Sequence, residues 1–309
     1  MDPWSETNIR ALETARASLV HISAKDPKDG SVALGSATVI DHYHVVASAQ
    51  FGDDTDEITV TTFDGRKRKA RPLATDPLYF IAVLRVEGRI EADLPALADL
   101  AELVPGRLVL SLGDPFGYGP TVSMGVIGAA DRTIYRPERI PVDGLIVTDA
   151  VIHPGNMGGP LITLDGRVAG VNGIAWGQGL GLAVQAETIW RVANQIIEYG
   201  EATHPWLGFG GEPEVIDQAL VRLFDLPVDR GVVVAYVASE GPGRDAGVEP
   251  LDLVVGVDGL SVASLGAIRR ALARRRPGER AKLTVLRGGE LIDLDIRVEN
   301  MPRLTKSEN

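Results

Sequence analysis

One glycine-rich stretch decides the fold: Thr148-Asp149-Ala150-Val151-Ile152-His153-Pro154-Gly155-Asn156-Met157-Gly158-Gly159-Pro160-Leu161. A Pro-Gly-Asn turn is followed by one residue, then by Gly-Gly-Pro and an apolar run. Glycines in such a turn let successive backbone N–H groups face one point outside the chain, which is how an oxyanion hole is built. The stretch therefore predicts a hydrolase-shaped turn with Gly155 and Met157 as N–H donors. Met157, however, stands where a nucleophile would act, and a thioether cannot attack a carbonyl.

Short apolar or alternating runs surround this stretch and predict a mostly β fold. They fall into two consecutive sets of about six strands, over residues 19–86 and 105–184, with turns at roughly 8–12-residue spacing. Two such sets indicate two packed β-barrels. An apolar stripe at helical spacing then predicts a helix over residues 186–199 that ends at Gly200.

The two ends of the chain follow other patterns. Within the N-terminal segment 1–17, a possible contact with another subunit, residues 5–17 predict a short helix capped by Ser5 or Thr7. Trp4 precedes this helix as a candidate contact residue. A new pattern of strands begins near residue 206 and runs to 299, with a helix expected over residues 264–276. Residues 300–309 predict a flexible polar tail.

Composition and charge argue against several classes of function. The 309 residues include 31 Lys and Arg against 42 Asp and Glu, and a net charge of −11 disfavours binding to nucleic acid or to an anionic membrane. There is no Cys, hence no disulfide or thiolate site. His42 and His44 offer two metal ligands without a third, so we expect no metal and no cofactor.

The sequence shows no basic and apolar leader and no apolar run long enough to span a membrane. It therefore predicts a cytoplasmic protein. A chain from which an N-terminal anchor had been removed would look the same.

Four blocks resemble the HtrA/DegP family, in which a trypsin-like serine protease is followed by one or two PDZ domains. The blocks are Gly35–Asp41, Thr75–Pro77, Leu112–Gly117 and Thr148–Leu161. The resemblance extends from residue 17 to residue 299. It implies a chymotrypsin-like double β-barrel over residues 18–200 and one PDZ domain over residues 206–299.

The resemblance also implies a Ser-His-Asp triad, and all three of its positions hold other residues. Met157 stands at the nucleophile, Gln50 at the base and Phe80 at the acid. Met157 has no proton to give, and Gln50 cannot act as a base near neutral pH. A carboxylate at position 80 would be an unpaired buried charge, so Phe80 is expected to fill that site with apolar volume. These losses predict that the chain is not an enzyme but a pseudoprotease, which binds peptides or unfolded chains without hydrolysis.

The C-terminal segment resembles a PDZ domain at its carboxylate-binding loop. In such loops backbone N–H groups hold the terminal carboxylate of a peptide that adds a strand to the sheet. The peptide-binding residues implied here are Leu207, Gly208 and Phe209 in the loop, with Ile268 and Leu272 on the helix. Leu251 stands where the family usually has Gly.

Two alternatives remain open at this stage. The first is an active serine endopeptidase with an atypical nucleophile, for which Ser48 and Ser123 are the testable candidates. The second is a regulatory subunit of an active paralogue. Expected partners are peptides, protein C-termini and misfolded proteins, and the resemblance implies a homotrimer formed through the N-terminal residues.

Overall fold

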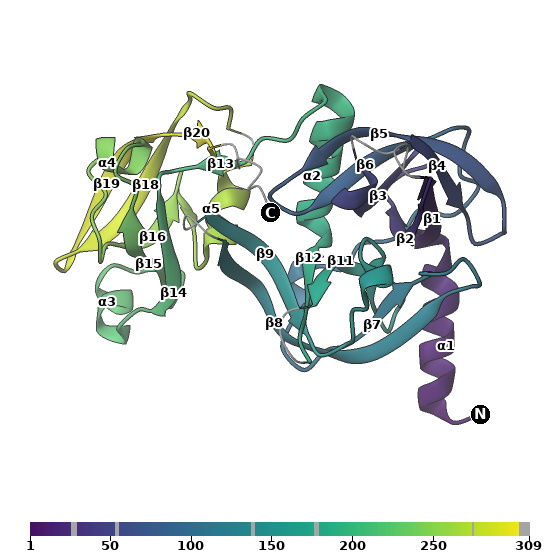
Figure 1. Cartoon of the computed structure of the whole chain (residues 1–309). Coiled ribbons are helices and arrows are strands. Elements are labelled where there is room, and N and C mark those ends of the chain that lie inside the picture. Colours follow the sequence, from purple (N-terminus) through teal and green to yellow (C-terminus); the bar gives the residue numbers. More distant parts are fainter. Residues whose placement is uncertain (26–29, 53–55, 137–139, 176–178, 274, 303–309) are drawn as a thin grey trace. The chain divides into compact units, whose positions relative to one another are not determined.

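The computed structural model describes residues 1–25, 30–52, 56–136, 140–175, 179–273 and 275–302 (Figure 1). Strands make up 46% of the chain and helices 20%, which confirms the predicted mostly β fold. The chain forms two compact units, and the first contains Met1–Ala130 and Gly144–Ala202. The second contains Asp131–Asp143 and Thr203–Asn309. Most of the predicted C-terminal tail, from residue 303 onward, lies outside the described residues.

The first barrel is closed in the order β1-β2-β3-β6-β5-β4. Its strands are β1 Leu19–Lys25, β2 Val32–Val39, β3 His44–Ser48, β4 Asp56–Thr61, β5 Lys67–Asp76 and β6 Ile81–Val86. Val45 pairs with Leu84 across β3 and β6, and both side chains are fully buried in the barrel core with Ile22. This burial of apolar side chains is the main favourable term in the stability of the barrel.

The second barrel is closed in the order β10-β11-β12-β9-β8-β7. Its strands are β7 Leu108–Gly113, β8 Thr121–Arg136, β9 Ile140–Thr148, β10 Pro160–Thr163, β11 Val168–Ala175 and β12 Gly181–Gln185. Short 3₁₀ turns lie between strands of the two barrels: η2 Ala49–Phe51, η3 Leu100–Glu102 and η5 Pro154–Asn156. Two consecutive six-stranded barrels confirm the architecture predicted from strand spacing.

Two helices complete the first unit. Helix α1, Pro3–Ala15, is followed by the 3₁₀ turn η1, Arg16–Ser18. Asp2 rather than Ser5 or Thr7 caps α1, because its Oδ1 accepts the N–H of Ser5 at 3.0 Å. Helix α2, Ala186–Tyr199, ends as predicted at Gly200, whose N–H donates to the Ile196 carbonyl.

The second unit is built on the sheet β14-β15-β16-β18-β19, in which β14 is an edge strand. Its strands are β13 Pro205–Trp206, β14 Phe209–Val215, β15 Arg230–Val237, β16 Leu253–Val257, β17 Leu260–Ser261, β18 Arg280–Arg287, β19 Glu290–Arg297 and β20 Glu299–Asn300. Its helices are α3 Gln218–Leu223, α4 Pro242–Asp245 and α5 Leu265–Leu272. Ser264 caps α5 as predicted, but the helix ends at Leu272 rather than at residue 276.

Candidate functional site

The glycine-rich turn η5 is held against both barrels of the first unit. A Cβ atom on Gly158 would lie 2.6 Å from the Ser36 carbonyl oxygen and 2.9 Å from the Ser48 nitrogen, and Gly158 has φ +85°. Only glycine combines that backbone conformation with so close an approach. The turn therefore packs directly against the first barrel, at the end of β3.

Buried hydrogen bonds fix the shape of this turn. Ser36 Oγ donates to the Gly155 carbonyl at 2.6 Å, and Thr38 Oγ1 donates to the Gly158 carbonyl at 2.8 Å. Asn172, which is 2% exposed, donates from Nδ2 to the Asn156 carbonyl at 3.3 Å and to the Leu112 carbonyl at 3.0 Å. Buried polar groups must find partners, so these residues hold the turn in one geometry.

The three positions expected to correspond to a catalytic triad come from segments that the fold brings together. Gln50 lies in η2, directly after β3, and Phe80 directly precedes β6. The Ala49 N–H donates to the Phe80 carbonyl at 2.9 Å, which joins these two segments. Met157 follows η5 and adjoins Gly158, which packs against Ser48. The three segments thus meet where the two barrels face each other.

Phe80 does not fill a buried site, so that expectation is wrong. Its side chain is 47% exposed and its backbone has φ +56°. The preceding turn explains the difference: Asp76 Oδ1 accepts the Tyr79 N–H at 2.9 Å, and the turn buries Leu78 and Tyr79. The buried side chains next to β6 therefore come from residues 78 and 79, and the left-handed residue that follows is exposed.

The N–H group of Met157 is used within the turn. It donates to the Pro154 carbonyl at 3.3 Å, closing the 3₁₀ turn η5. An oxyanion hole needs N–H groups that point at the substrate oxygen. The predicted hole at Gly155 and Met157 would therefore require this turn to open.

Hydroxyl groups near the turn are bonded to carbonyls. Besides Ser36 and Thr38, Ser123 Oγ donates to the Val151 carbonyl at 2.5 Å. Thr148 Oγ1 donates to the Val126 carbonyl at 2.8 Å. A nucleophilic hydroxyl is activated by a general base within hydrogen-bond reach, whereas the hydroxyls of Ser123 and Thr148 donate to backbone carbonyls.

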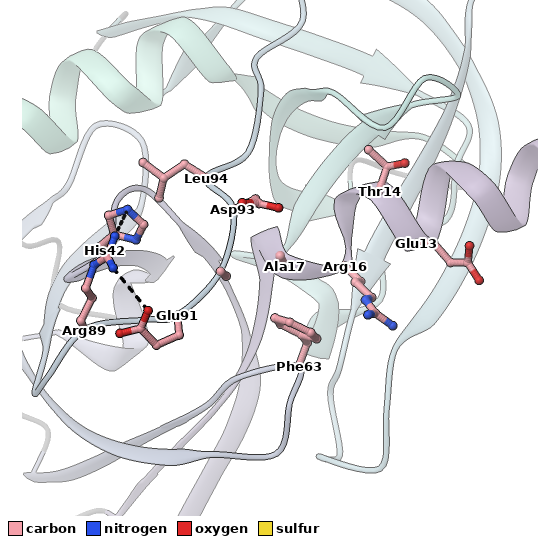
Figure 2. A pocket seen from close by; sticks show the side chains of 11 residues that line it. Glu13, Thr14, Arg16, Ala17, His42, Phe63, Arg89, Glu91, Asp93 and Leu94 are labelled. Carbon is pink, nitrogen blue, oxygen red and sulfur yellow. Dashed lines mark hydrogen bonds and ion pairs between the residues drawn. The ribbon is translucent and has the colours of Figure 1, made fainter.

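A polar pocket of about 670 Å³ in the first unit is lined by none of these residues (Figure 2). His42 and Arg89 lie together on one side, where Arg89 Nη2 approaches His42 Nε2 at 2.8 Å, while Phe63 lies opposite near Arg16. Because the His42 ring faces a guanidinium, binding of a metal cation at its Nε2 is disfavoured. Within the described ranges, no three His, Cys, Asp or Glu side chains gather closely enough to hold a metal.

The PDZ-like residues form one apolar site in the second unit. Loop residues Leu207 and Phe209 and helix residues Ile268 and Leu272 are all at least 95% buried, and they line the same pocket. Between the two loop residues, Gly208 has φ +75°, and a Cβ there would lie 2.9 Å from the Gly243 nitrogen. The structure therefore brings together all five residues that the sequence assigned to peptide binding.

Sequence reasoning missed a third contributor to this pocket. The end of β8 from Asp131 and the start of β9 as far as Asp143 group with the second unit, and Pro141 of β9 lines the pocket. Tyr135 bonds to Gly211 of β14, and Arg269 of α5 bonds to the Pro141 carbonyl. These contacts join positions 76 and 128 residues apart, and no local sequence pattern signals them.

Comparisons with known proteins agree with this architecture. A trypsin-like peptidase domain matches residues 29–171, and a PDZ domain matches residues 210–298. The fold and its sites define a protein of the trypsin-like peptidase class with an attached PDZ domain. The chain belongs to the HtrA family, as the sequence predicted.

Individual relatives support the same assignment. A protein of Halomonas elongata named "Probable periplasmic serine endoprotease DegP-like" is 34% identical over 87% of this chain, and one of the same name from Chlamydia muridarum is 33% identical over 88%. The chain spans 57% and 54% of their lengths. A solved structure described as HtrA-type protease AlgW with tripeptide matches with a TM-score of 0.70 and 28% identity, covering 96% of this chain and 98% of that one.

These comparisons correct two expectations. Relatives at 30–34% identity over most of the chain are named serine endoproteases, which contradicts the expectation that the chain is not an enzyme. The same relatives are named periplasmic proteins, which contradicts the expected cytoplasmic location. Among the described residues, no helix has the length and hydropathy needed to cross a bilayer.

Proposed function

We propose that this chain captures the C-terminal segments of peptides, and of unfolded or misfolded proteins, in its PDZ domain. The observation that carries the proposal is the edge strand β14, which begins at the Leu207–Phe209 loop beside α5. A peptide added to this edge would pair with β14 through its backbone. Its terminal carboxylate would accept the loop N–H groups, and Ile268 and Leu272 would favour an apolar last residue.

The test compares two forms of one labelled peptide that ends in an apolar residue. Fluorescence anisotropy should show the free-acid form binding at least about tenfold more tightly than the C-terminal amide, because the loop hydrogen bonds need the charged carboxylate. Ile268→Ala should weaken binding, whereas Leu260→Ala, at a 59% exposed position, should not. Equal affinity for acid and amide would contradict the proposal.

The relatives favour a second candidate function, serine endopeptidase activity. Since positions 50, 80 and 157 hold Gln, Phe and Met, hydrolysis would need another nucleophile. Ser48 is one candidate because its backbone lies against Gly158, and Ser123 is the other. Casein digestion and labelling by a serine-directed phosphonate should then disappear in Ser48→Ala or in Ser123→Ala. Retention of cleavage and labelling in both variants would exclude both residues.

We further propose that copies of this chain associate through α1. Trp4 on this helix is 61% exposed, and a large exposed aromatic side chain is typical of contact residues. Native mass spectrometry should show a homotrimer that dissociates in Trp4→Ala. A monomeric wild-type chain would contradict this proposal, and a mixed complex isolated from the natural source would indicate a paralogous partner.

A further inference from the structure

Tyr135 bonds to both backbone groups of Gly211 on β14. Its hydroxyl donates to the Gly211 carbonyl at 2.6 Å and accepts the Gly211 N–H at 2.9 Å. On its other side β14 pairs with β15, so Tyr135 bonds to the free edge of the sheet. An added peptide strand would need these same N–H and C=O groups. The Tyr135 hydroxyl thus occupies the two Gly211 backbone groups that one residue of an added strand would use.

The same segment also closes the apolar pocket. Pro141 lines the pocket together with residues of α5, and Arg269 Nη2 of that helix donates to its carbonyl at 3.0 Å. Arg269 also forms a buried ion pair with Asp143. The free volume left in the pocket is about 20 Å³. That is about enough for a single water molecule, so a peptide side chain cannot enter without displacing Pro141.

A third contact fastens this segment to the start of α5. The Asp131 carboxylate receives two hydrogen bonds from Arg270, at 3.0 and 2.9 Å, and one from Ser264. A Cβ on Gly266 would lie 2.3 Å from Asp131 Oδ1, so the helix accommodates the carboxylate only because residue 266 is glycine. Bidentate Arg–carboxylate pairs combine strength with fixed geometry.

We propose that the end of β8 from Asp131 to Arg136 and the start of β9 from Ile140 to Asp143 are internal occupants of the peptide groove, which a C-terminal peptide must displace before it binds. The inference rests on the proposed peptide-binding function. Because only molecules with an open groove can bind, the apparent affinity is the intrinsic affinity reduced by the open fraction. Weakening the contacts of Tyr135 or Asp131 therefore raises the affinity for peptide.

The experiment measures the dissociation constant of the free-acid peptide for the full chain and three variants. Tyr135→Phe removes the hydroxyl and leaves the ring, and Asp131→Asn weakens the contact with Arg270. Tyr118→Phe is the matched control, since Tyr118 is 96% exposed in the first unit. We expect roughly tenfold tighter binding in the first two variants, because hydrogen bonds are lost from the closed state alone, and no change in the control.

A second readout follows the contact itself. Amide hydrogen exchange at Gly211 should accelerate in Tyr135→Phe and remain slow in Tyr118→Phe. Thermal unfolding checks that each variant is folded. Unchanged or weaker binding in both Tyr135→Phe and Asp131→Asn, with the preference for the free acid retained, would overturn this inference and leave the proposed function standing. Loss of that preference in every protein would overturn the proposed function and the inference with it.

Discussion

The backbone N–H of Ala49 donates to the carbonyl oxygen of Phe80 at 2.9 Å. This bond extends the ladder between β3 and β6 by one step beyond the pairing of Ser48 with Ile81. Together with the close approach of Gly158 to Ser48, it holds residues 50, 80 and 157 in neighbouring segments. The backbone of the first unit therefore brings together the segments that carry Gln50, Phe80 and Met157, the three positions expected to correspond to a catalytic triad.

Introducing the side chains of a Ser-His-Asp triad at these three positions tests whether the backbone supports triad chemistry. The triple variant Gln50→His, Phe80→Asp and Met157→Ser should cleave casein about 10²–10⁴-fold faster than Met157→Ser alone. The reason is that a serine hydroxyl needs a positioned imidazole base to lose its proton. The measurement is the initial rate of release of labelled casein fragments.

The double variant Gln50→His with Phe80→Asp is the matched control, because it supplies a base and an acid without a nucleophile. Its rate should equal that of the unmodified chain. Equal rates for the triple variant and Met157→Ser alone would show that η5 does not hold residue 157 in a reactive position.

Local signals in the sequence predicted much of the fold. Short apolar and alternating runs predicted the strands of the two barrels. Gly200 predicted the end of α2, and Ser264 predicted the cap of α5. These features were predictable because each depends on residues that are neighbours in the chain. The residues of the PDZ-like pocket were also predicted, through their resemblance to a family pattern.

Features that depend on distant contacts were not predictable. The exposure of Phe80 follows from a turn that buries Leu78 and Tyr79, and no periodicity in the sequence indicates which residue of that turn is buried. The bond between Tyr135 and Gly211 joins residues of the two predicted domains, so each domain taken alone gives no sign of it. Reading the triad positions as a loss of enzyme function relied on side chains alone, and the relatives contradict it.

Leu251 has a strained backbone that glycine would relieve. It has φ +74° and is 82% exposed, so its side chain buries little surface in return. A left-handed conformation costs a residue with a Cβ about 1–2 kcal/mol. Leu251→Gly should raise the free energy of unfolding of the second unit by about 1 kcal/mol, measured by urea denaturation. Leu260→Gly, at a position without positive φ, should lower it, and a loss of stability in Leu251→Gly would refute the assignment of strain.

Arg287 neutralises a buried carboxylate. Its Nε and Nη2 donate to Asp252 at 2.6 and 2.7 Å, and Asp252 is 1% exposed. Arg287→Ala would leave that charge buried and unpaired and should cost about 3–5 kcal/mol of stability in chemical denaturation. Arg280→Ala breaks a solvent-exposed pair with Asp295 and should change stability by less than about 1 kcal/mol. Similar losses in the two variants would contradict this account.

Alkaline pH should weaken the second unit through Tyr135. Burial raises the pKa of its hydroxyl from 10.0 to about 12, and the hydrogen bond with Gly211 acts in the opposite direction. A raised folded-state pKa means that stabilisation is complete below pH 10 and is lost as the pH rises toward 12. Thermal unfolding between these pH values should show a smaller decline in Tyr135→Phe than in the unmodified chain. Parallel declines would show that Tyr135 is not the responsible group.

The most direct test of the peptide-capture proposal observes the backbone amides of the carboxylate loop. In ¹H–¹⁵N spectra of the full chain, the free-acid peptide should shift the resonances of Leu207, Gly208 and Phe209, and the C-terminal amide should not. Such a result would place the peptide carboxylate on the loop N–H groups. Shifts that are the same with both peptides, or that leave these three residues unmoved, would contradict the proposal.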